Sequence, residues 1–224
     1  MNRSFAPIRD LLDRVRIQPS TNERIHYWVY GPLFRRWCET HPCEVVVGRY
    51  ELYRRLVESE GLDGPIDYLE FGVSRGDSMR WWVEANRHPE TTFVGFDSFE
   101  GLPEAWAGWP EGAFSADGEM PSIADERCQF VKGLFHDTLP NWLMAHEFSR
   151  RTVLHLDADL YTSTLLVLTQ LLPKLKADSI LIFDEFDDPL HEYRALHDAM
   201  GAYRRDFVPL CRTERWTATA LKAI

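Results

Sequence analysis

Three kinds of protein are disfavoured by what the sequence lacks. It has no run of 18 apolar residues and no apolar N-terminal stretch of the kind found in secretory signals, so we expect no membrane association and no export. Basic residues are in deficit, with 25 Lys and Arg against 35 Asp and Glu and a formal net charge of −10. Because nucleic-acid backbones attract positively charged surfaces, this balance argues against a nucleic-acid partner.

Cysteine is scarce as well. The four cysteines are irregularly spaced and form no C-x-x-C pair, which argues against a disulfide framework. His41 lies between Cys38 and Cys43, a pattern that only faintly resembles a zinc site. Free thiols in a reducing compartment explain these residues better, so we expect a cytoplasmic protein.

The length of 224 residues and the 45% content of hydrophobic residues suit one α/β domain with a short appendage. Residues 1–48 contain amphipathic pieces interrupted by Pro19 and Pro32, together with a cluster of aromatic residues. We expect short helices here that pack on the main domain, cover a pocket or contact a second copy of the chain. Residues 49–224 then form the main domain.

From residue 50 onward, short apolar runs alternate with segments of helical periodicity. The predicted strands are 66–71, 92–96, 129–131, 152–156 and 179–183, followed by a strand pair at 207–212 and 217–223, and the predicted helices include 77–86, 162–175 and 190–203. This alternation predicts parallel βαβ units and therefore a doubly wound α/β sheet with helices on both faces.

Acidic residues end most of the predicted strands. Glu70 lies within the first strand, and Asp97, Asp157 and Asp184 each follow a later one. Ligands of doubly wound sheets bind outside the carboxyl ends of the strands, where the strand order reverses. Four carboxylates delivered to one edge therefore favour a binding site there.

The first strand leads into a glycine turn, in the segment 70–78 (EFGVSRGDS). The dinucleotide fingerprint G-x-G-x-x-G would need a central glycine that this segment lacks. A ligand with an amino-acid end fits better, because Glu70 can attract an ammonium group while Ser78 and the amides of the following helix hold a carboxylate. A simple turn after a strand is the alternative.

Two later segments suit a nucleoside. Asp97 follows the second strand and can accept hydrogen bonds from both hydroxyls of a ribose, in NAD-binding proteins as well as in others. The segment 133–137, with Phe135 and His136, is placed to enclose and hydrogen-bond an adenine. An ordinary loop histidine is the alternative for His136.

Four runs of residues resemble the macrocin/mycinamicin/novobiocin-type O-methyltransferases. They are 68–73 (YLEFGV), 96–103 (FDSFEGLP), 137–140 (DTLP) and 156–164 (LDADLYTST), in the same order and spacing as in that family, and the resemblance spans roughly residues 50–203. It implies the Rossmann-like class I methyltransferase fold, S-adenosylmethionine as methyl donor, and a small hydroxylated acceptor, often a deoxysugar of a natural product. The chain ends soon after the resembling part, so the acceptor is not carried over.

The resemblance also implies roles for individual residues. The donor site then comprises Glu70, Gly72, Val73, Ser78, Asp97, Ser98, Phe135, His136 and Asp157, and a divalent cation, usually Mg²⁺, is held by Asp157, Asp184 and Glu185. Asp159 corresponds to the family's second acid and is the candidate general base for deprotonating the acceptor hydroxyl.

Several alternatives to these roles stay open. Glu185 departs from the Asp or Asn usual in the family, and Asp187 and Asp188 lie close enough to compete as metal ligands. The strand-end acids can instead cap helices without a metal, and Asp159 in particular can cap the helix that follows it.

The segment 101–120 is long, irregular and rich in tryptophan, which favours a lid or an acceptor wall. The sequence as a whole predicts a metal-assisted O-methyltransferase. Its rivals are an NAD-type oxidoreductase on the same fold and a nucleoside-binding module without catalytic activity.

Overall fold

The computed structural model describes the backbone from Pro19 to Ile224 and the side chains from Glu23 onward. Eight strands and six helices follow one another along this part of the chain. They are α2 (Pro19–Thr40), β1 (Glu44–Val46), α3 (Arg49–Glu60), β2 (Ile66–Phe71), α4 (Asp77–Ala85), β3 (Thr92–Asp97), β4 (Cys128–Lys132), α5 (Phe135–Ala145), β5 (Arg151–Leu156), α6 (Tyr161–Leu171), β6 (Ile180–Phe183), α7 (Glu192–Tyr203), β7 (Phe207–Thr213) and β8 (Thr219–Ala223).

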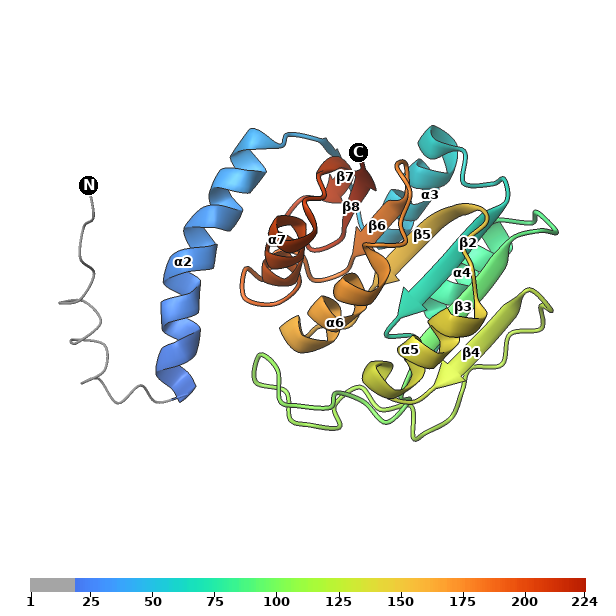
Figure 1. Cartoon of the computed structure of the whole chain (residues 1–224), viewed down its shortest axis with the longest axis horizontal. Coiled ribbons are helices and arrows are strands. Elements are labelled where there is room, and N and C mark those ends of the chain that lie inside the picture. Colours follow the sequence, from blue (N-terminus) through green and yellow to red (C-terminus); the bar gives the residue numbers. More distant parts are fainter. Residues whose placement is uncertain (1–18) are drawn as a thin grey trace.

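All eight strands form one sheet in the order β1-β7-β8-β6-β5-β2-β3-β4. The strands pair in parallel except for β8, which runs antiparallel to both β6 and β7. The chain passes from β2 outward to β3 and β4 and then returns to β5 beside β2, so the strand order reverses between β2 and β5. This arrangement is the doubly wound α/β sheet that the sequence predicts (Figure 1).

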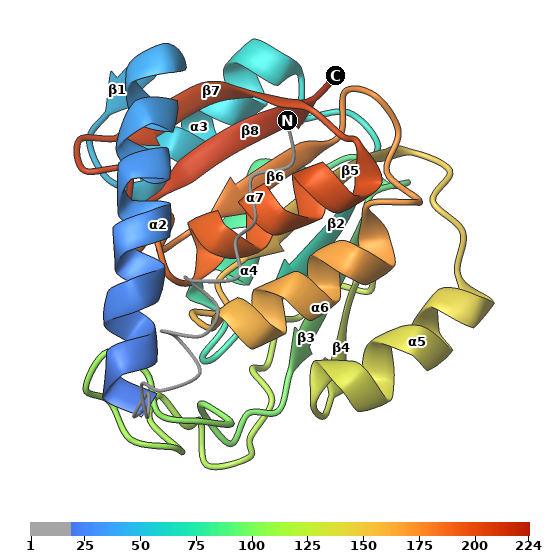
Figure 2. The same cartoon turned by 60° about the vertical axis from the view of Figure 1, so that its left-hand side comes forward.

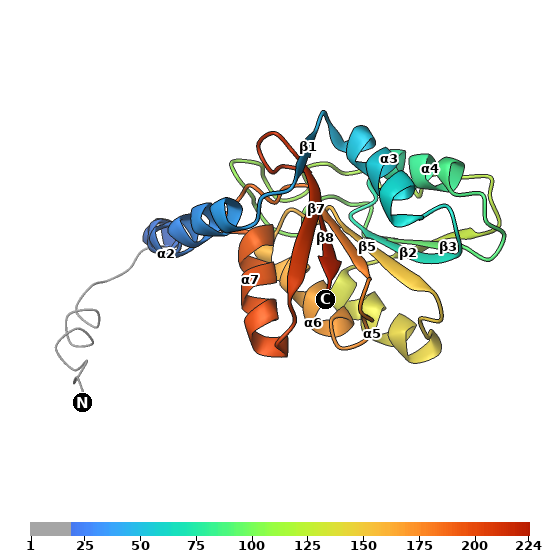
Figure 3. The same ribbon diagram turned by 90° about the horizontal axis from the view of Figure 1, so that it is seen from above.

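Side chains of successive strand residues enter two separate cores. Leu69 and Phe71 of β2 pack in the core beneath α5, α6 and α7, whereas Ile66 and Tyr68 pack in the core beneath α3 and α4. Seen from above, the two sets of helices lie on opposite sides of the strands (Figure 3). Because both faces are covered, β2 is buried along its whole length, including its two acidic residues, Asp67 and Glu70.

Helix α2 corrects one prediction. The sequence predicts an interruption at Pro32, but a single helix of 22 residues runs through it. The contacts of its C-terminal half outweigh the hydrogen bond that proline cannot donate: Phe34 and Trp37 pack edge-on against Phe186 and Tyr193, and the helix stands beside α7 (Figure 2).

The expected appendage of residues 1–48 also contributes to the sheet. Glu44–Val46 forms the edge strand β1, which pairs in parallel with β7. The amphipathic pieces expected before residue 19 lie outside the described residues. Within the described residues, no helix is both long and apolar enough to cross a membrane.

Candidate functional site

A cavity of about 680 Å³ opens where the strand order reverses, at the carboxyl ends of β2, β3, β5 and β6. Its volume lies in the range of small-molecule sites. Its walls include every residue for which the sequence predicts a role, namely Glu70, Gly72, Val73, Ser78, Asp97, Ser98, Phe135, His136, Asp157, Asp159, Asp184 and Glu185. The fold thus brings together residues from five separate segments of the chain.

The turn after β2 is shaped by its neighbours in the sheet. Gly72 has a φ of 91°, and a Cβ atom there would lie 1.7 Å from the carbonyl oxygen of Asp157. Asp97 fixes the next two residues, because its Oδ2 accepts hydrogen bonds from the backbone N–H groups of Val73 (2.8 Å) and Ser74 (2.7 Å). Its Oδ1 accepts the N–H of Phe99 at 2.7 Å. Asp97 therefore builds the turn, and of its four or so acceptor positions about one stays free for a ligand.

A buried chain of hydrogen bonds joins Ser78 to Glu70. Tyr53 Oη lies 3.2 Å from both Ser78 Oγ and His155 Nε2, and Tyr68 Oη lies 2.8 Å from both His155 Nδ1 and Glu70 Oε2. Since Glu70 only accepts when ionised, Tyr68 donates to it, His155 Nδ1–H donates to Tyr68, Tyr53 donates to His155 Nε2, and Ser78 donates to Tyr53. One neutral tautomer of His155 satisfies all four bonds.

In the segment 133–137, which is predicted to enclose the adenine, helix α5 begins at Phe135, so Phe135 and His136 lie in a helix and not in a loop. Phe135 packs edge-on against Phe71 at a ring distance of 5.3 Å, which holds the start of this helix against β2. His136 is exposed at the cavity wall, 3.5 Å from Asp137. Ser98, at the end of β3, accepts the N–H of Glu100 at 3.1 Å and so shapes the adjacent turn.

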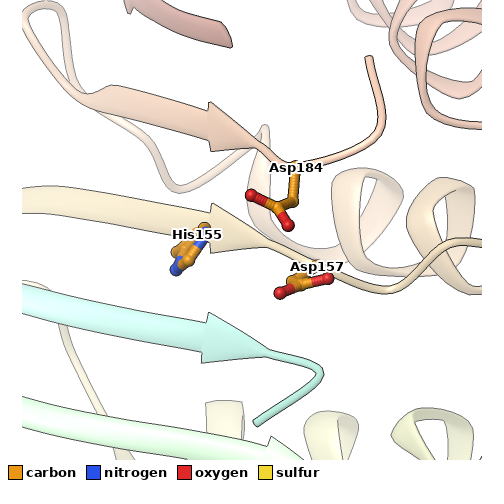
Figure 4. A group of neighbouring side chains, drawn as sticks. All are labelled: His155, Asp157 and Asp184. Atoms are coloured by element: carbon orange, nitrogen blue, oxygen red, sulfur yellow. The ribbon is translucent and has the colours of Figure 1, made fainter. Parts of the chain in front are cut away.

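Asp157 and Asp184 end the neighbouring strands β5 and β6 (Figure 4). One ligand atom from each of these two carboxylates and from His155 lie within 4.8 Å of one another. His155 already uses both ring nitrogens in the buried chain, so the two carboxylates are the better ligands. Glu185 lines the same cavity but does not belong to this close group.

Negative charge is crowded at these two strand ends. Burial and the neighbouring Asp184 raise the pKa of Asp157 well above its ordinary value. Burial, Asp184 and Asp97 raise the pKa of Asp159 to about 6, and burial, Asp184 and Asp187 raise the pKa of Glu185 to about 7. Carboxylates that repel one another in this way favour the approach of a cation or a proton.

Asp159 has no capping role. Its backbone lies in the left-handed region (φ 56°), helix α6 begins after Leu160, and no side chain caps its N-terminus. The interpretation of Asp159 as a helix cap is therefore wrong. The residue is instead a cavity-lining acid with a raised pKa.

Four functional candidates escape sequence reasoning. Arg49, the first residue of α3, places its Nη1 3.1 Å from Asp184 Oδ2 and 3.6 Å from Asp157 Oδ2. Glu192 is fully buried and its Oε2 accepts the N–H of Glu185 at 3.0 Å, which fixes the turn after β6. His155 and Tyr53 form the buried chain above. The polar groups of Tyr53 and His155 within otherwise apolar segments are the signal in the sequence that could have found them. No comparable signal marks Arg49 or Glu192.

Part of the segment 101–120 forms one wall of the cavity. It is held by backbone hydrogen bonds such as Leu102 N–H to Ala113 at 2.9 Å, and Thr162 of α6 donates to Glu104 at 2.6 Å. Trp106 and Phe114 line the cavity, as an acceptor wall would. The segment is therefore a structured loop with aromatic side chains turned to the site.

Comparison with known proteins gives this geometry its context. A family described as "Methyltransferase domain" matches residues 69–186, more than half of the chain and all of the strand ends described above. The chain belongs to this family.

Individual relatives within this family are O-methyltransferases. The methyltransferase is 31% identical over 189 residues to an 8-demethyl-8-(2,3-dimethoxy-alpha-L-rhamnosyl)-tetracenomycin-C 4'-O-methyltransferase of Streptomyces olivaceus, covering 72% of this chain and 71% of that one. It is 29% identical to the demethyldecarbamoylnovobiocin O-methyltransferase of Streptomyces niveus, covering 73% and 72% of the two chains. The solved structure of the O-methyltransferase NovP is 26% identical, with a TM-score of 0.57 over 78% of each chain.

These matches confirm the resemblance to the macrocin/mycinamicin/novobiocin-type enzymes and the class I methyltransferase fold. The protein is an enzyme of O-methyl transfer.

Proposed function

We propose that the enzyme transfers the methyl group of S-adenosylmethionine to a hydroxyl group on a sugar of a small glycosylated natural product, with a divalent cation assisting. The observation that carries the proposal is the convergence of all twelve predicted residues on one cavity at the switch in strand order. The name of the Streptomyces olivaceus relative gives a rhamnosyl tetracenomycin as its acceptor, and that of the Streptomyces niveus relative gives demethyldecarbamoylnovobiocin.

One side of the cavity suits the methyl donor. We call it the donor half; it comprises the predicted residues after β2, β3 and β4, namely Glu70, Gly72, Val73, Ser78, Asp97, Ser98, Phe135 and His136. Glu70 Oε2 accepts a hydrogen bond from Tyr68 Oη, which leaves Oε1 to accept a hydrogen bond from the ammonium group of the donor. Ser78 lies in the first turn of α4, where free amides attract a carboxylate. Phe135 offers a ring against the adenine.

The other side suits the acceptor. We call it the acidic half; it comprises Asp157, Asp159, Asp184 and Glu185. With a pKa of about 6, Asp159 is ionised at pH 7 yet basic enough to take a proton. The acceptor oxygen forms a bond to the methyl carbon while the carbon–sulfur bond breaks, and the hydroxyl proton passes to Asp159. Holding both substrates in line supplies much of the acceleration.

The acidic half fits a divalent cation of the Mg²⁺ type. Asp157 and Asp184 offer converging carboxylate oxygens, the ligands that hard cations prefer. Burial, together with repulsion from Asp184, raises the pKa values of the neighbouring Asp159 and Glu185. Glu185 stands next in the chain as a further oxygen donor. A bound Mg²⁺ would withdraw electrons from the acceptor hydroxyl and lower its pKa.

The division of the chain fits this function. We propose that residues 49–224 form the methyltransferase domain and that residues 1–48 form an appendage to it. All residues that line the cavity belong to 49–224, whereas the described part of the appendage contributes α2 and the edge strand β1.

The proposal is tested by methyl transfer from isotope-labelled S-adenosylmethionine to a panel of glycosides with free sugar hydroxyls. We expect label in at least one glycoside and none in the matching aglycone. Binding of S-adenosylhomocysteine without transfer to any member would favour a binding module. Stabilisation by NADH and not by S-adenosylhomocysteine would favour an oxidoreductase.

A further inference from the structure

Arg49 occupies the place where a cation would neutralise the acidic half. Its guanidinium lies 3.1 Å from Asp184 and 3.6 Å from Asp157, between the ends of β6 and β5. A guanidinium keeps its charge in proteins, so Arg49 supplies one positive charge to these two carboxylates.

Asp157 and Asp184 each form an ion pair with Arg49, and within the described residues neither pairs with another arginine or lysine. Both acids offer Oδ2 to Arg49, and the same two carboxylates form the convergent group described above. A guanidinium and a divalent cation cannot both occupy the space between these oxygens, because each would repel the other. The pairing and the metal are thus alternatives.

The structure leaves room for Arg49 to move aside. It begins α3 directly after Gly48, and its side chain is 43% exposed. It also lines a second cavity of about 360 Å³, whose walls include Asp184, Glu185, Glu214 and Arg215. Arg49 thus borders both cavities, and Glu214 offers a carboxylate in the second one.

We propose that Arg49 is a displaceable counter-ion, which neutralises Asp157 and Asp184 while no metal is bound and turns toward the second cavity when a divalent cation takes its place. The inference rests on the metal-assisted function proposed above. Its consequence is that the wild-type enzyme binds its metal more weakly than the carboxylates alone would, because each binding event first breaks the ion pair.

The test is a titration of metal-stripped protein with Mn²⁺, followed by the electron paramagnetic resonance of the free ion. Arg49→Gln should bind Mn²⁺ about three- to tenfold more tightly than wild type, as expected from removing a partly exposed ion pair. Arg55→Gln is the matched control: Arg55 lies on the same helix, is 41% exposed and pairs with Glu44, so its loss changes net charge equally but should leave Mn²⁺ affinity unchanged.

Equal or weaker Mn²⁺ affinity in Arg49→Gln would overturn the proposal, as would Mn²⁺ binding to the variant and none to wild type, since Arg49 would then be a permanent cation. If Arg49→Gln does not fold, Arg49→Lys provides the test. The shorter lysine side chain should pair less well with Asp157 and Asp184, so this variant should also bind Mn²⁺ more tightly than wild type. Methyl transfer with and without Mg²⁺ separates the two proposals. If transfer depends on Mg²⁺ and Arg49→Gln binds Mn²⁺ no more tightly than wild type, only the inference on Arg49 fails; if no protein binds Mn²⁺, the metal-assisted function fails as well.

Discussion

The donor half and the acidic half of the cavity differ in how their polar groups are satisfied. In the donor half, Asp97 accepts three backbone N–H groups, and a buried chain of hydrogen bonds joins Ser78 to Glu70. In the acidic half, Asp157, Asp159 and Glu185 have raised pKa values, and Arg49 supplies the countercharge for Asp157 and Asp184.

This difference indicates two kinds of binding site. Groups that are already hydrogen-bonded hold their positions before a ligand arrives, so the donor half is preorganised. One guanidinium faces four crowded carboxyl groups in the acidic half, so this half is completed by what binds to it. Four variants or conditions sharpen the comparison, described from the largest expected effect to the smallest.

Asp159→Asn should slow methyl transfer by about two to four orders of magnitude, the usual range for a lost general base. The affinity for S-adenosylhomocysteine should stay at the wild-type value, because the donor half is untouched. Steady-state turnover and calorimetry measure the two quantities, and Asp63→Asn, at an exposed position outside the cavity, serves as a control. Turnover at the wild-type rate would assign the base to another residue.

Gly72→Ala should destabilise the fold by about 3 kcal/mol or more, because a Cβ at a φ of 91° would meet the carbonyl oxygen of Asp157 at 1.7 Å. Gly108 is a matched control, since it has the same φ of 91° and a Cβ added there would meet no atom within 4 Å. Its replacement by alanine should cost only about 1–2 kcal/mol, the penalty for the left-handed conformation. Urea unfolding measures the loss of stability in both variants. Equal losses would refute the close contact between Gly72 and the carbonyl oxygen of Asp157.

His155→Phe should cost about 2–3 kcal/mol of stability, because Tyr53 and Tyr68 would lose a buried partner. If His155 positions Glu70 and Ser78, the KM for S-adenosylmethionine should rise about tenfold while the KM for the acceptor stays unchanged. His155→Gln retains a donor and an acceptor and should recover part of the donor affinity. Loss of stability with an unchanged donor KM would leave His155 a purely structural residue.

The acidic half should make the metal-free fold less stable as the pH rises. Asp159 has a pKa of about 6 when folded against an ordinary 3.8, so between these values the unfolded chain loses the proton first and stability falls. Relative to wild type, Asp159→Asn should gain about 1–2 kcal/mol across this window and hold the gain above pH 6. Chemical unfolding of chelated protein from pH 4 to 7.5 measures this, and a gain independent of pH would contradict it.

The sequence predicts the parallel sheet and the site acids well, because both follow from local pattern. The strands around the switch point are short, mostly apolar segments, and parallel strands carry the residues at their carboxyl ends to one edge of the sheet. Asp97, Asp157 and Asp184 are therefore placed correctly without any knowledge of side-chain contacts.

The features that escape the sequence depend on contacts between distant segments. The helix through Pro32 persists because Phe34 and Trp37 bury their rings against α7 and the turn before it, about 150 residues away. In the sequence, nothing distinguishes Arg49 from any other arginine in the first turn of a helix. In the fold, α3 places it beside the end of β6. Its contact with Asp184 follows from tertiary packing, which no local pattern encodes.

The most direct test of the contrast between the two halves is a calorimetric titration of metal-stripped protein with S-adenosylhomocysteine, repeated in the presence of Mg²⁺. A preorganised donor half predicts one molecule bound per chain, with Kd values that agree within about threefold between the two titrations. No binding without Mg²⁺, or binding of NADH in its place, would contradict the account.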